Sequence, residues 1–368
     1  MPRTFKNLYP QITSFANLLL AAKKAQAGKR YQENVLAFNF QLEPELFRLQ
    51  EELRNKTYRP GPYRDFMVYD SKPRLISAAP YRDRVVHHAI MNVIEPRFDS
   101  MFIFDSYACR KSKGTHAALF RFREFLARHR YVLKCDIRKY FQSMDQEILL
   151  EKLRRKIADS ETLWLLAAII GSTDFNDQNP NRYFPGDDLF APLARRRGIP
   201  VGNLTSQFFA NLYLNDFDHW LLEELRAGPY LRYVDDFCVF GDDKERLNQI
   251  RSSIQEHLAT LRLSIHEGKS RIYTTKEGIE FLGFRHLPGR TRVRQENLKR
   301  FKGRMRKLQR EYGEGKIPLT RVRDSIVSWV AHASYAHSEE LRRKVFSDFA
   351  FVKAGIRDRR AVAATASG

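Results

Sequence analysis

Aspartates at the ends of apolar segments are the residues of this sequence best suited to chemistry. Asp136 ends one such segment, and Asp235 and Asp236 lie between two others, at 230–234 and 237–240. Two adjacent carboxylates between buried strands would repel each other and lose hydration, which is costly unless cations compensate. Three carboxylates in this setting match the oxygen ligands of a two-magnesium site for phosphoryl transfer.

Two other pairs of adjacent aspartates lack this setting. The pair at 187–188 lies in a polar loop and the pair at 242–243 follows a glycine, so both are expected in solvated turns. The alternative for Asp235 and Asp236 is a tight β-hairpin whose turn merely tolerates aspartate. Asp136 weighs against that alternative because it also ends an apolar strand.

The charge of the chain indicates a polyanionic partner. Its 368 residues carry 64 Lys and Arg against 43 Asp and Glu, a net charge of +21. Such a field attracts nucleic acid over long range, while a basic membrane-surface protein and a solvated basic face are the competing interpretations. No apolar run approaches the ~20 residues of a membrane span, so we expect no membrane partner.

Length and cysteine content suggest a multi-lobed protein of a reducing compartment. An apolar content of 43% supports a globular core, and the length favours two or three lobes. The N-terminus does not resemble a secretory signal. Cys109, Cys135 and Cys238 are odd in number and widely spaced, which fits neither a disulfide framework nor a zinc site. A cytoplasmic location is the expectation.

The elements that must position the carboxylates follow from periodicity and turn residues. Helices are expected over 14–53 around a polar break at 28–34, over 83–98, from Thr115 to about His129, and from about Leu204 to Leu225. A hairpin is expected over 58–79 and buried strands at 131–136, 230–234 and 237–240. Asp145 is expected to cap a helix, and 290–310 is expected to be a strongly basic helical segment.

Seven ordered motifs resemble those of reverse transcriptases, the RNA-directed DNA polymerases. Tyr233-Val234-Asp235-Asp236 is similar to the family's Tyr-x-Asp-Asp motif. The others, in the family's order, are Lys72-Pro73-Arg74 with Asp83-Arg84-Val85-Val86; Ser106-Tyr107-Ala108-Cys109-Arg110 with Gly114-Thr115-His116; Asp136-Ile137-Arg138-Lys139-Tyr140-Phe141; Val201 to Gln207; Gly268-Lys269; and Phe281-Leu282-Gly283-Phe284. The resemblance covers about residues 58–290.

The resemblance implies an α+β right-hand polymerase fold. Its parts would be fingers of helix and hairpin, a palm in which helices back an antiparallel sheet, and a small helical thumb. The expected boundaries are 1–57 for an N-terminal helical extension, 58–130 for the fingers, 131–288 for the palm with a loop insertion at about 172–195, 289–360 for the thumb, and 361–368 for a disordered tail.

The resemblance also assigns roles to single residues. Asp136, Asp235 and Asp236 would be catalytic and would bind two magnesium ions, or manganese in their place, with Ile137 also in the metal site. Six residues would bind the deoxynucleoside triphosphate: Lys72, Arg74, Phe141, Val201, Gly202 and Lys269. Among these, Lys72 and Arg74 would grip the triphosphate, Phe141 would exclude a ribose 2′-hydroxyl, and Lys269 would assist the leaving pyrophosphate. An ordinary core Phe and a solvated surface Lys are the alternatives for the last two.

Basic residues in two places are expected to contact the template RNA and the primer or cDNA. Arg110, Lys111 and Lys113 precede the helix at Thr115, whose positive end also favours phosphate. A thumb helix would track the duplex backbone through Arg294, Lys299, Arg300, Lys302 and Arg306. Such contacts are not base-specific, so binding should weaken steeply with salt.

One departure from the family pattern narrows the subtype. Most bacterial reverse transcriptases of this lineage have Gln-Gly, three residues, then Ser-Pro, where this chain has Val201-Gly202 and Ser206-Gln207. This pattern resembles the reverse transcriptases of diversity-generating retroelements, which copy a template RNA with frequent errors at adenine. That family implies a small basic accessory protein as a further partner. Simple packing of Val201 is the alternative.

Three rival functions stay open on the sequence alone. One is another bacterial reverse transcriptase, of the group II intron or phage-defence type. A second is a nucleic-acid-binding scaffold that does not polymerise, against which the three intact aspartates argue. The third is a metal-dependent nuclease, which would not need triphosphate-gripping residues such as Lys72 and Arg74.

Overall fold

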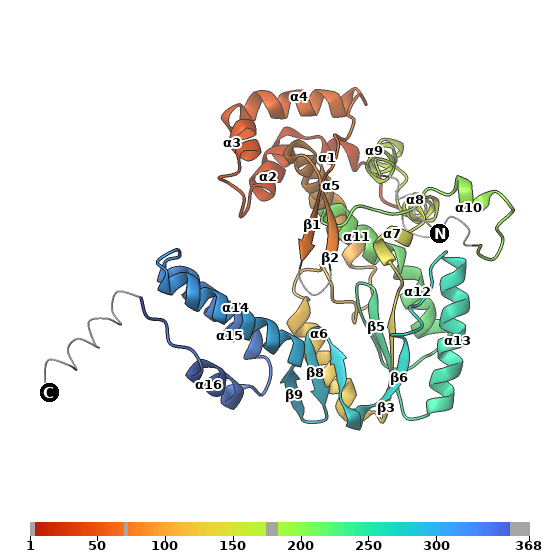
Figure 1. Cartoon of the computed structure of the whole chain (residues 1–368). Helices are drawn as coiled ribbons and strands as arrows, with labels where there is room; N and C mark the ends of the chain where they lie inside the picture. The colour runs from red at the N-terminus through yellow and green to blue at the C-terminus, as the bar shows by residue number, and fades with distance from the viewer. Residues whose placement is uncertain (1–3, 70–72, 174–182, 354–368) are drawn as a thin grey trace, which may run out of the picture. The chain divides into compact units, whose positions relative to one another are not determined.

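The computed structural model describes residues 4–69, 73–173 and 183–353 (Figure 1). Lys72 and the predicted tail at 361–368 lie outside these residues. The chain forms two compact units, one of Met1–Ala118 with Leu133–Ile272 and the other of Leu119–Val132 with Tyr273–Gly368.

The N-terminal region of the first unit is helical, as the periodicity predicts. Its helices are α1 (Tyr9–Ile12), α2 (Phe15–Ala25), α3 (Glu33–Phe40) and α4 (Leu42–Arg54), followed after a hairpin by α5 (Tyr81–Asp99). Ser14 caps α2 by accepting a hydrogen bond from the Asn17 amide, as expected of a serine at this position. The Tyr81 hydroxyl donates to the Ala22 carbonyl at 3.1 Å, which joins α5 to α2.

The predicted hairpin is present as β1 (Arg64–Tyr69) and β2 (Pro73–Ala78). The two strands are antiparallel, with Arg64 opposite Ala78. β1 is exposed along its whole length, whereas Ser77 of β2 is buried. The Ser77 amide donates to the Val201 carbonyl at 3.0 Å, so the base of the hairpin is tied to the segment before α11.

A four-stranded sheet holds the carboxylate segments. Its strands are β3 (Tyr131–Asp136), β4 (Tyr230–Tyr233), β5 (Asp236–Gly241) and β6 (Arg271–Thr274), in the order β4-β5-β3-β6. β4 and β5 are antiparallel neighbours. Because β5 lies between β4 and β3, the start of β5 and the end of β3 bring aspartates from distant parts of the sequence together. Figure 1 shows α11, α12 and α13 beside this sheet.

The prediction of one long helix over 204–225 is wrong. The segment is divided into α11 (Leu204–Tyr213), α12 (Asn215–His219) and a π-helical turn, η1 (Trp220–Glu224). Leu214 departs from helical geometry with φ −95° and ψ 3°. The wider turn is closed by the Leu225 amide on the Trp220 carbonyl, a π-type bond. The break lets Asp218 point into the interior, where it is fully buried.

The first unit contains further helices along the chain. They are α7 (Tyr140–Ser143), α8 (Gln146–Arg154), α9 (Ser160–Ile170), α10 (Ala191–Ala194) and α13 (Lys244–Thr260), and α6 (Thr115–Arg128) begins in this unit. The cap predicted at Asp145 is confirmed, because its carboxylate accepts the Glu147 and Ile148 amides. Asp243 caps α13 in the same way.

The solvated turn expected at Asp187 is a second wrong prediction. Its carboxylate is almost fully buried and pairs with Arg195 of the same insertion. Arg195 and Arg262 also pair with Asp145. Long-range ion pairs thus bury a carboxylate that local composition assigns to solvent.

In the described part of the chain, the second unit combines a small sheet with most of α6 and with three later helices. The sheet is antiparallel, ordered β7 (Ile279–Phe281), β8 (Phe284–Leu287) and β9 (Arg290–Val293). The helices are α14 (Gln295–Gly313), α15 (Leu319–Ala333) and α16 (Glu339–Ser347). Phe301 stacks on Trp329 with ring centroids 4.0 Å apart at the centre of their core. The predicted basic helix therefore begins after β9, since its first four residues form a strand.

Among the residues that the structure describes, no helix is long and apolar enough to cross a membrane.

Candidate active site and nucleic-acid interface

The β4–β5 hairpin presents the adjacent aspartates on a two-residue turn. Tyr233 pairs with Asp236 across the hairpin, so Val234 and Asp235 form the turn. Val234 has φ +59°, a conformation that strains a β-branched residue. The Tyr233 hydroxyl lies 3.0 Å from Thr115 Oγ1, at the start of α6. The turn is therefore held in one unusual conformation.

Asp136 reaches the same place from the end of β3. The amide of the next residue, Ile137, donates to the Asp235 carbonyl at 3.2 Å. The backbone of Asp136 is fixed on its other side, since its amide donates to Ser270 Oγ at 3.3 Å and its carbonyl accepts the His266 amide at 2.7 Å. The structure thus brings together Asp136, Ile137, Asp235 and Asp236, the four residues predicted for the metal site.

Burial makes the negative charge of this group costly. It raises the pKa of Asp235 to about 6, with the neighbouring charge of Asp236 as the second cause. Burial also raises the pKa of Asp236, although the Lys134 ammonium opposes the shift. Perturbed carboxylates in such a position are typical of functional sites. We call Asp136, Asp235 and Asp236 the palm carboxylates.

Two lysines supply positive charge beside the palm carboxylates. Lys269 Nζ lies 2.7 Å from Asp136 Oδ2, and Lys134 Nζ lies 3.7 Å from Asp236 Oδ1. Lys269 was predicted from the sequence, whereas Lys134 was not. The signal that could have found Lys134 is its place two residues before Asp136, which puts both side chains on one face of a strand.

The palm carboxylates fit a magnesium site in their chemistry. Among the described residues Asp236 Oδ1 is buried and accepts no hydrogen bond, with Lys134 Nζ 3.7 Å away, so this oxygen has an acceptor position where a cation would be favourable. Carboxylate oxygens are the ligands that magnesium prefers. Within the described residues no group of three or more His, Cys, Asp or Glu side chains is arranged to hold a metal as it stands. Asp136 would have to exchange its Lys269 partner for the ion.

The predicted nucleotide-binding residues lie on three segments. Arg74 is exposed on β2, and Lys72 lies outside the described residues. Gly202 has φ +111°, and a Cβ there would lie 2.8 Å from Ile76 Cγ2, so only glycine fits this contact. Val201 is partly buried beside β2, and Phe141 is partly buried in α7. The hairpin therefore packs on the Val201-Gly202 segment.

The loop before α6 uses two of its predicted phosphate ligands internally. Arg110 donates to Asp99 Oδ1 at 2.7 Å and to the carbonyls of Ile103 and Ser106. Lys113 Nζ donates to the Phe104 carbonyl at 2.8 Å. These bonds indicate that Arg110 holds the loop, and its phosphate contact stays a prediction that would require it to leave these partners. Lys111 is exposed and stays a predicted phosphate ligand.

The basic helix α14 has an apolar face and a charged face. Phe301, Met305 and Leu308 are buried, whereas Lys299, Arg300 and Arg306 are exposed. Arg294 precedes the helix and pairs with Glu280 and Glu296, and Lys302 pairs with Asp348 at 2.9 Å. The exposed residues of α14 stay predicted phosphate contacts, and Arg294 and Lys302 would first have to leave acidic partners.

A large basic cavity lies beside the Val201-Gly202 segment. Its volume is about 1,070 Å³, and it is lined by residues of α2, α3, α5, α11 and the hairpin. The charged side chains in its lining are Lys29, Glu33, Arg64 and Arg84, and its other polar side chains include His87, His88, Gln32, Asn34, Asn203 and Gln207. Asn203 Nδ2 is buried and donates no hydrogen bond. Arg84, Asn203 and Gln207 lie in the motifs quoted above, whereas Lys29 and Arg64 were not predicted from the sequence to belong to a site.

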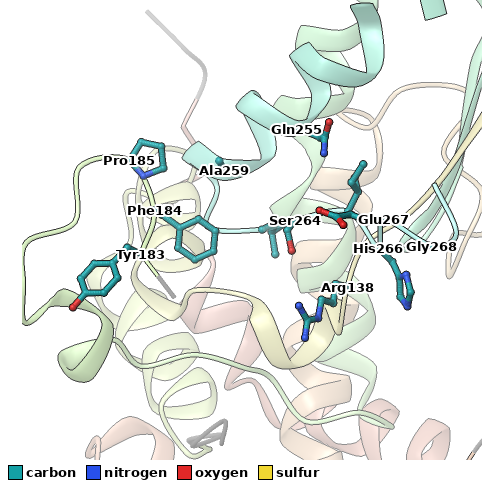
Figure 2. A pocket seen from close by; sticks show the side chains of 12 residues that line it. Arg138, Tyr183, Phe184, Pro185, Gln255, Ala259, Ser264, His266, Glu267 and Gly268 are labelled. Carbon is teal, nitrogen blue, oxygen red and sulfur yellow. The ribbon is translucent and has the colours of Figure 1, made fainter. Parts of the chain in front are cut away.

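A second cavity, of about 660 Å³, lies beside the segment that follows Asp136. Figure 2 shows Tyr183, Phe184 and Pro185 of the insertion on one side and His266 and Glu267 on the other. The insertion therefore reaches the neighbourhood of the palm motif, although the sequence predicts only a polar loop there.

Comparison with known proteins agrees with this geometry. A family model described as "Reverse transcriptase (RNA-dependent DNA polymerase)" matches residues 64–286. Protein YkfC of Escherichia coli (strain K12) is 26% identical over 317 residues, which are 75% of this chain and 80% of that protein.

Two further relatives have names that refer to introns. The group II intron-encoded protein LtrA of Lactococcus lactis subsp. cremoris is 21% identical over 184 residues, 49% of this chain and 29% of LtrA. The nuclear intron maturase 4 of Arabidopsis thaliana is 26% identical over 136 residues, 37% of this chain and 16% of the maturase. The chain thus spans less than a third of either protein. Because the family model covers more than half of the chain, this protein belongs to the reverse transcriptase family of RNA-dependent DNA polymerases.

Proposed function

We propose that this polymerase copies a template RNA into cDNA with low fidelity at adenine, as part of a diversity-generating retroelement. The observation that supports the proposal is Val201 in the position where most of the lineage has glutamine. An apolar side chain cannot hydrogen-bond the sugar or phosphate of the incoming nucleotide. Loss of about 1 kcal/mol of such bonding reduces discrimination about fivefold.

The surroundings of Val201 are compatible with a role beside the nucleotide. Its carbonyl is held by the Ser77 amide, and Gly202 lies against Ile76. A side chain at position 201 is therefore fixed in place relative to β2, which also bears Arg74. Gln207, the second departure from the lineage pattern, lines the basic cavity.

The reaction we propose is nucleotidyl transfer to a primer. Asp136, Asp235 and Asp236 would hold two magnesium ions, which supply activation of the primer 3′-hydroxyl and charge neutralisation of the leaving pyrophosphate. Lys269, whose ammonium lies 2.7 Å from Asp136, would donate a proton to that pyrophosphate. Arg74 and Lys72 would bind the triphosphate, and Phe141 would exclude ribonucleotides.

We also propose domain boundaries and partners for the chain. Residues 58–130 would be fingers, 131–288 palm and 289–360 thumb, after an N-terminal extension at 1–57. Template and primer backbones would contact Lys111 and the exposed residues of α14. A small basic accessory protein would be a further partner. The three cysteines are free, in keeping with a cytoplasmic location.

The test is primer extension on a defined RNA template, followed by sequencing of the cDNA. Val201→Gln should lower misincorporation opposite template adenine about fivefold, while Val201→Ile, which stays apolar, should not. The Asp235→Ala variant should not extend the primer at all, which controls for a contaminating polymerase. An unchanged error rate in Val201→Gln would discard the low-fidelity proposal and leave the polymerase assignment intact.

A second candidate is a group II intron-type reverse transcriptase, and the similarity to LtrA favours it. The same sequencing experiment separates the two functions. An intron-type enzyme should show few errors and no bias toward template adenine, in the wild type as well as in Val201→Gln.

A further inference from the structure

Arg232 is a charged residue in the interior that the proposed chemistry does not use. Its side chain and that of Asp218 are both fully buried. Arg232 Nε donates to Asp218 Oδ1 at 2.8 Å, and Nη2 donates to Oδ2 at 2.6 Å. The Tyr230 hydroxyl donates to the same carboxylate at 2.7 Å. This bidentate geometry fixes the plane of the Arg232 guanidinium.

The third nitrogen of Arg232 reaches the turn that presents the palm carboxylates. Its Nη1 donates to the Val234 carbonyl at 3.1 Å and to Asn211 Oδ1 at 3.2 Å. Val234 is the residue with φ +59°. A strained conformation of this kind persists only where its surroundings hold it, and the bond from Arg232 acts on the strained residue itself.

The backbone around Arg232 is anchored as well. Its amide donates to the Asp105 carbonyl at 2.9 Å, and its carbonyl accepts the Tyr107 amide at 3.0 Å. Asn211 donates to the Ala108 carbonyl at 2.9 Å. The guanidinium is thus fixed to α11, α12 and the segment 105–108, and it cannot follow the turn if the turn relaxes.

We propose that Arg232, oriented by Asp218, is a positioning residue that holds the Val234-Asp235 turn in its strained form. Asp235 and the following Asp236 then face Asp136 without rearrangement at the moment of reaction. The proposal rests on the polymerase function of the palm carboxylates. It differs from a purely structural ion pair because it predicts that relief of the strain at Val234 compensates for loss of the guanidinium.

The test compares four proteins on a primer–template at saturating nucleotide, with active sites counted by burst titration. Arg232→Met, which keeps length and removes the donors, should lower kcat per active site about 100-fold, the loss expected when catalytic groups are displaced by about 1 Å. Its affinity for primer–template should be unchanged. Arg232→Met with Val234→Gly should recover at least tenfold of that loss, since glycine adopts positive φ without strain. Val234→Gly alone gives the baseline for the double variant.

Arg195→Met is the matched control, because Arg195 is also a buried arginine paired with aspartate. It should lower thermal stability while kcat per active site stays near that of the wild type. If Arg232→Met does not fold, Arg232→Lys takes its place, because lysine cannot serve Asp218 and Val234 together. Normal kcat per active site in the Arg232 variant, or no recovery with glycine, would overturn the positioning role. A wild type that extends no primer would instead count against the polymerase function.

Discussion

Two groups of buried or partly buried aspartates in the first unit are stabilised in opposite ways. Asp145 and Asp187, which we call the paired carboxylates, face arginine side chains. Arg262 Nη1 lies 2.5 Å from Asp145 Oδ2, and Arg195 pairs with both aspartates. The palm carboxylates have Lys134 and Lys269 near them, and among the described residues Asp236 Oδ1 accepts no hydrogen bond.

Asp187 of the first group and Asp235 of the second have pKa values that are shifted in opposite directions. Burial alone would raise the pKa of Asp187, but hydrogen bonds from Arg195 and the Phe184 amide outweigh burial and lower it. For Asp235 burial and the nearby Asp236 act in the same direction, and the pKa rises to about 6. Carboxylates with complete partners hold a fold together, whereas carboxylates left short of partners have the capacity to bind cations.

The largest expected effect comes from removing one palm carboxylate. Asp236→Asn should lower the extension rate about 1,000-fold, which corresponds to about 4 kcal/mol of transition-state stabilisation. Its free energy of unfolding should not fall, because the substitution removes repulsion from Asp136. Single-turnover extension and urea unfolding in EDTA measure the two effects. A marked loss of stability in Asp236→Asn would mean that the palm carboxylates stabilise the fold as much as the paired carboxylates do.

The reverse pattern is expected for the paired carboxylates. Asp145→Asn leaves Arg195 and Arg262 without full compensation and should lower the free energy of unfolding by about 3 kcal/mol. Extension per titrated active site should change little. Glu147→Gln is the control, since Glu147 forms an exposed pair with Arg154 that should contribute less than about 1 kcal/mol. Equal free energies of unfolding for Asp145→Asn and Glu147→Gln would contradict the structural role of the paired carboxylates.

The buried side chain of His87 allows the effect of burial on a pKa to be tested by changing the pH. Burial in α5 lowers the pKa of His87 to about 3, with the charge of His88 as the second cause. The unfolded chain therefore binds the proton more readily, with a pKa of about 6.5. The stability due to neutral His87 is present above pH 6.5 and is lost by about 1.4 kcal/mol per pH unit as the pH falls toward 3. Urea unfolding of His87→Gln between pH 7 and 5 should show a shallower loss than the wild type, and parallel curves would refute the assignment.

Local patterns in the sequence were sufficient to predict the elements of the site. Hydrophobic runs ending on aspartate gave β3 and the β4–β5 hairpin, and the start of α6 at Thr115 followed from its capping residue. The same runs predict Val234 as the last residue of a strand, whereas the structure places it in the turn with a positive φ. Valine is among the residues least expected in that conformation.

Features that depend on distant residues were not predicted. The helical period of 204–225 is the same for an unbroken helix and for one interrupted at Leu214, and only burial of Asp218 against Arg232 distinguishes them. In Arg290–Val293 every second residue is buried, a strand pattern that the high charge of the segment obscured. The pairing of Asp187 with Arg262 joins residues far apart in the sequence, which composition cannot indicate.

The order of strands in the four-stranded sheet has a consequence for synthesis of the protein. β3 lies between β5 and β6, which follow it by about a hundred residues or more in the sequence, and Asp136 meets Lys269 across 133 positions. The ribosome adds about 5–20 residues per second, so β3 waits several seconds for its neighbours. During that interval an apolar strand has both edges unpaired, a state prone to aggregation. Slower translation before β5 should therefore reduce the yield of soluble enzyme more than slower translation after β6.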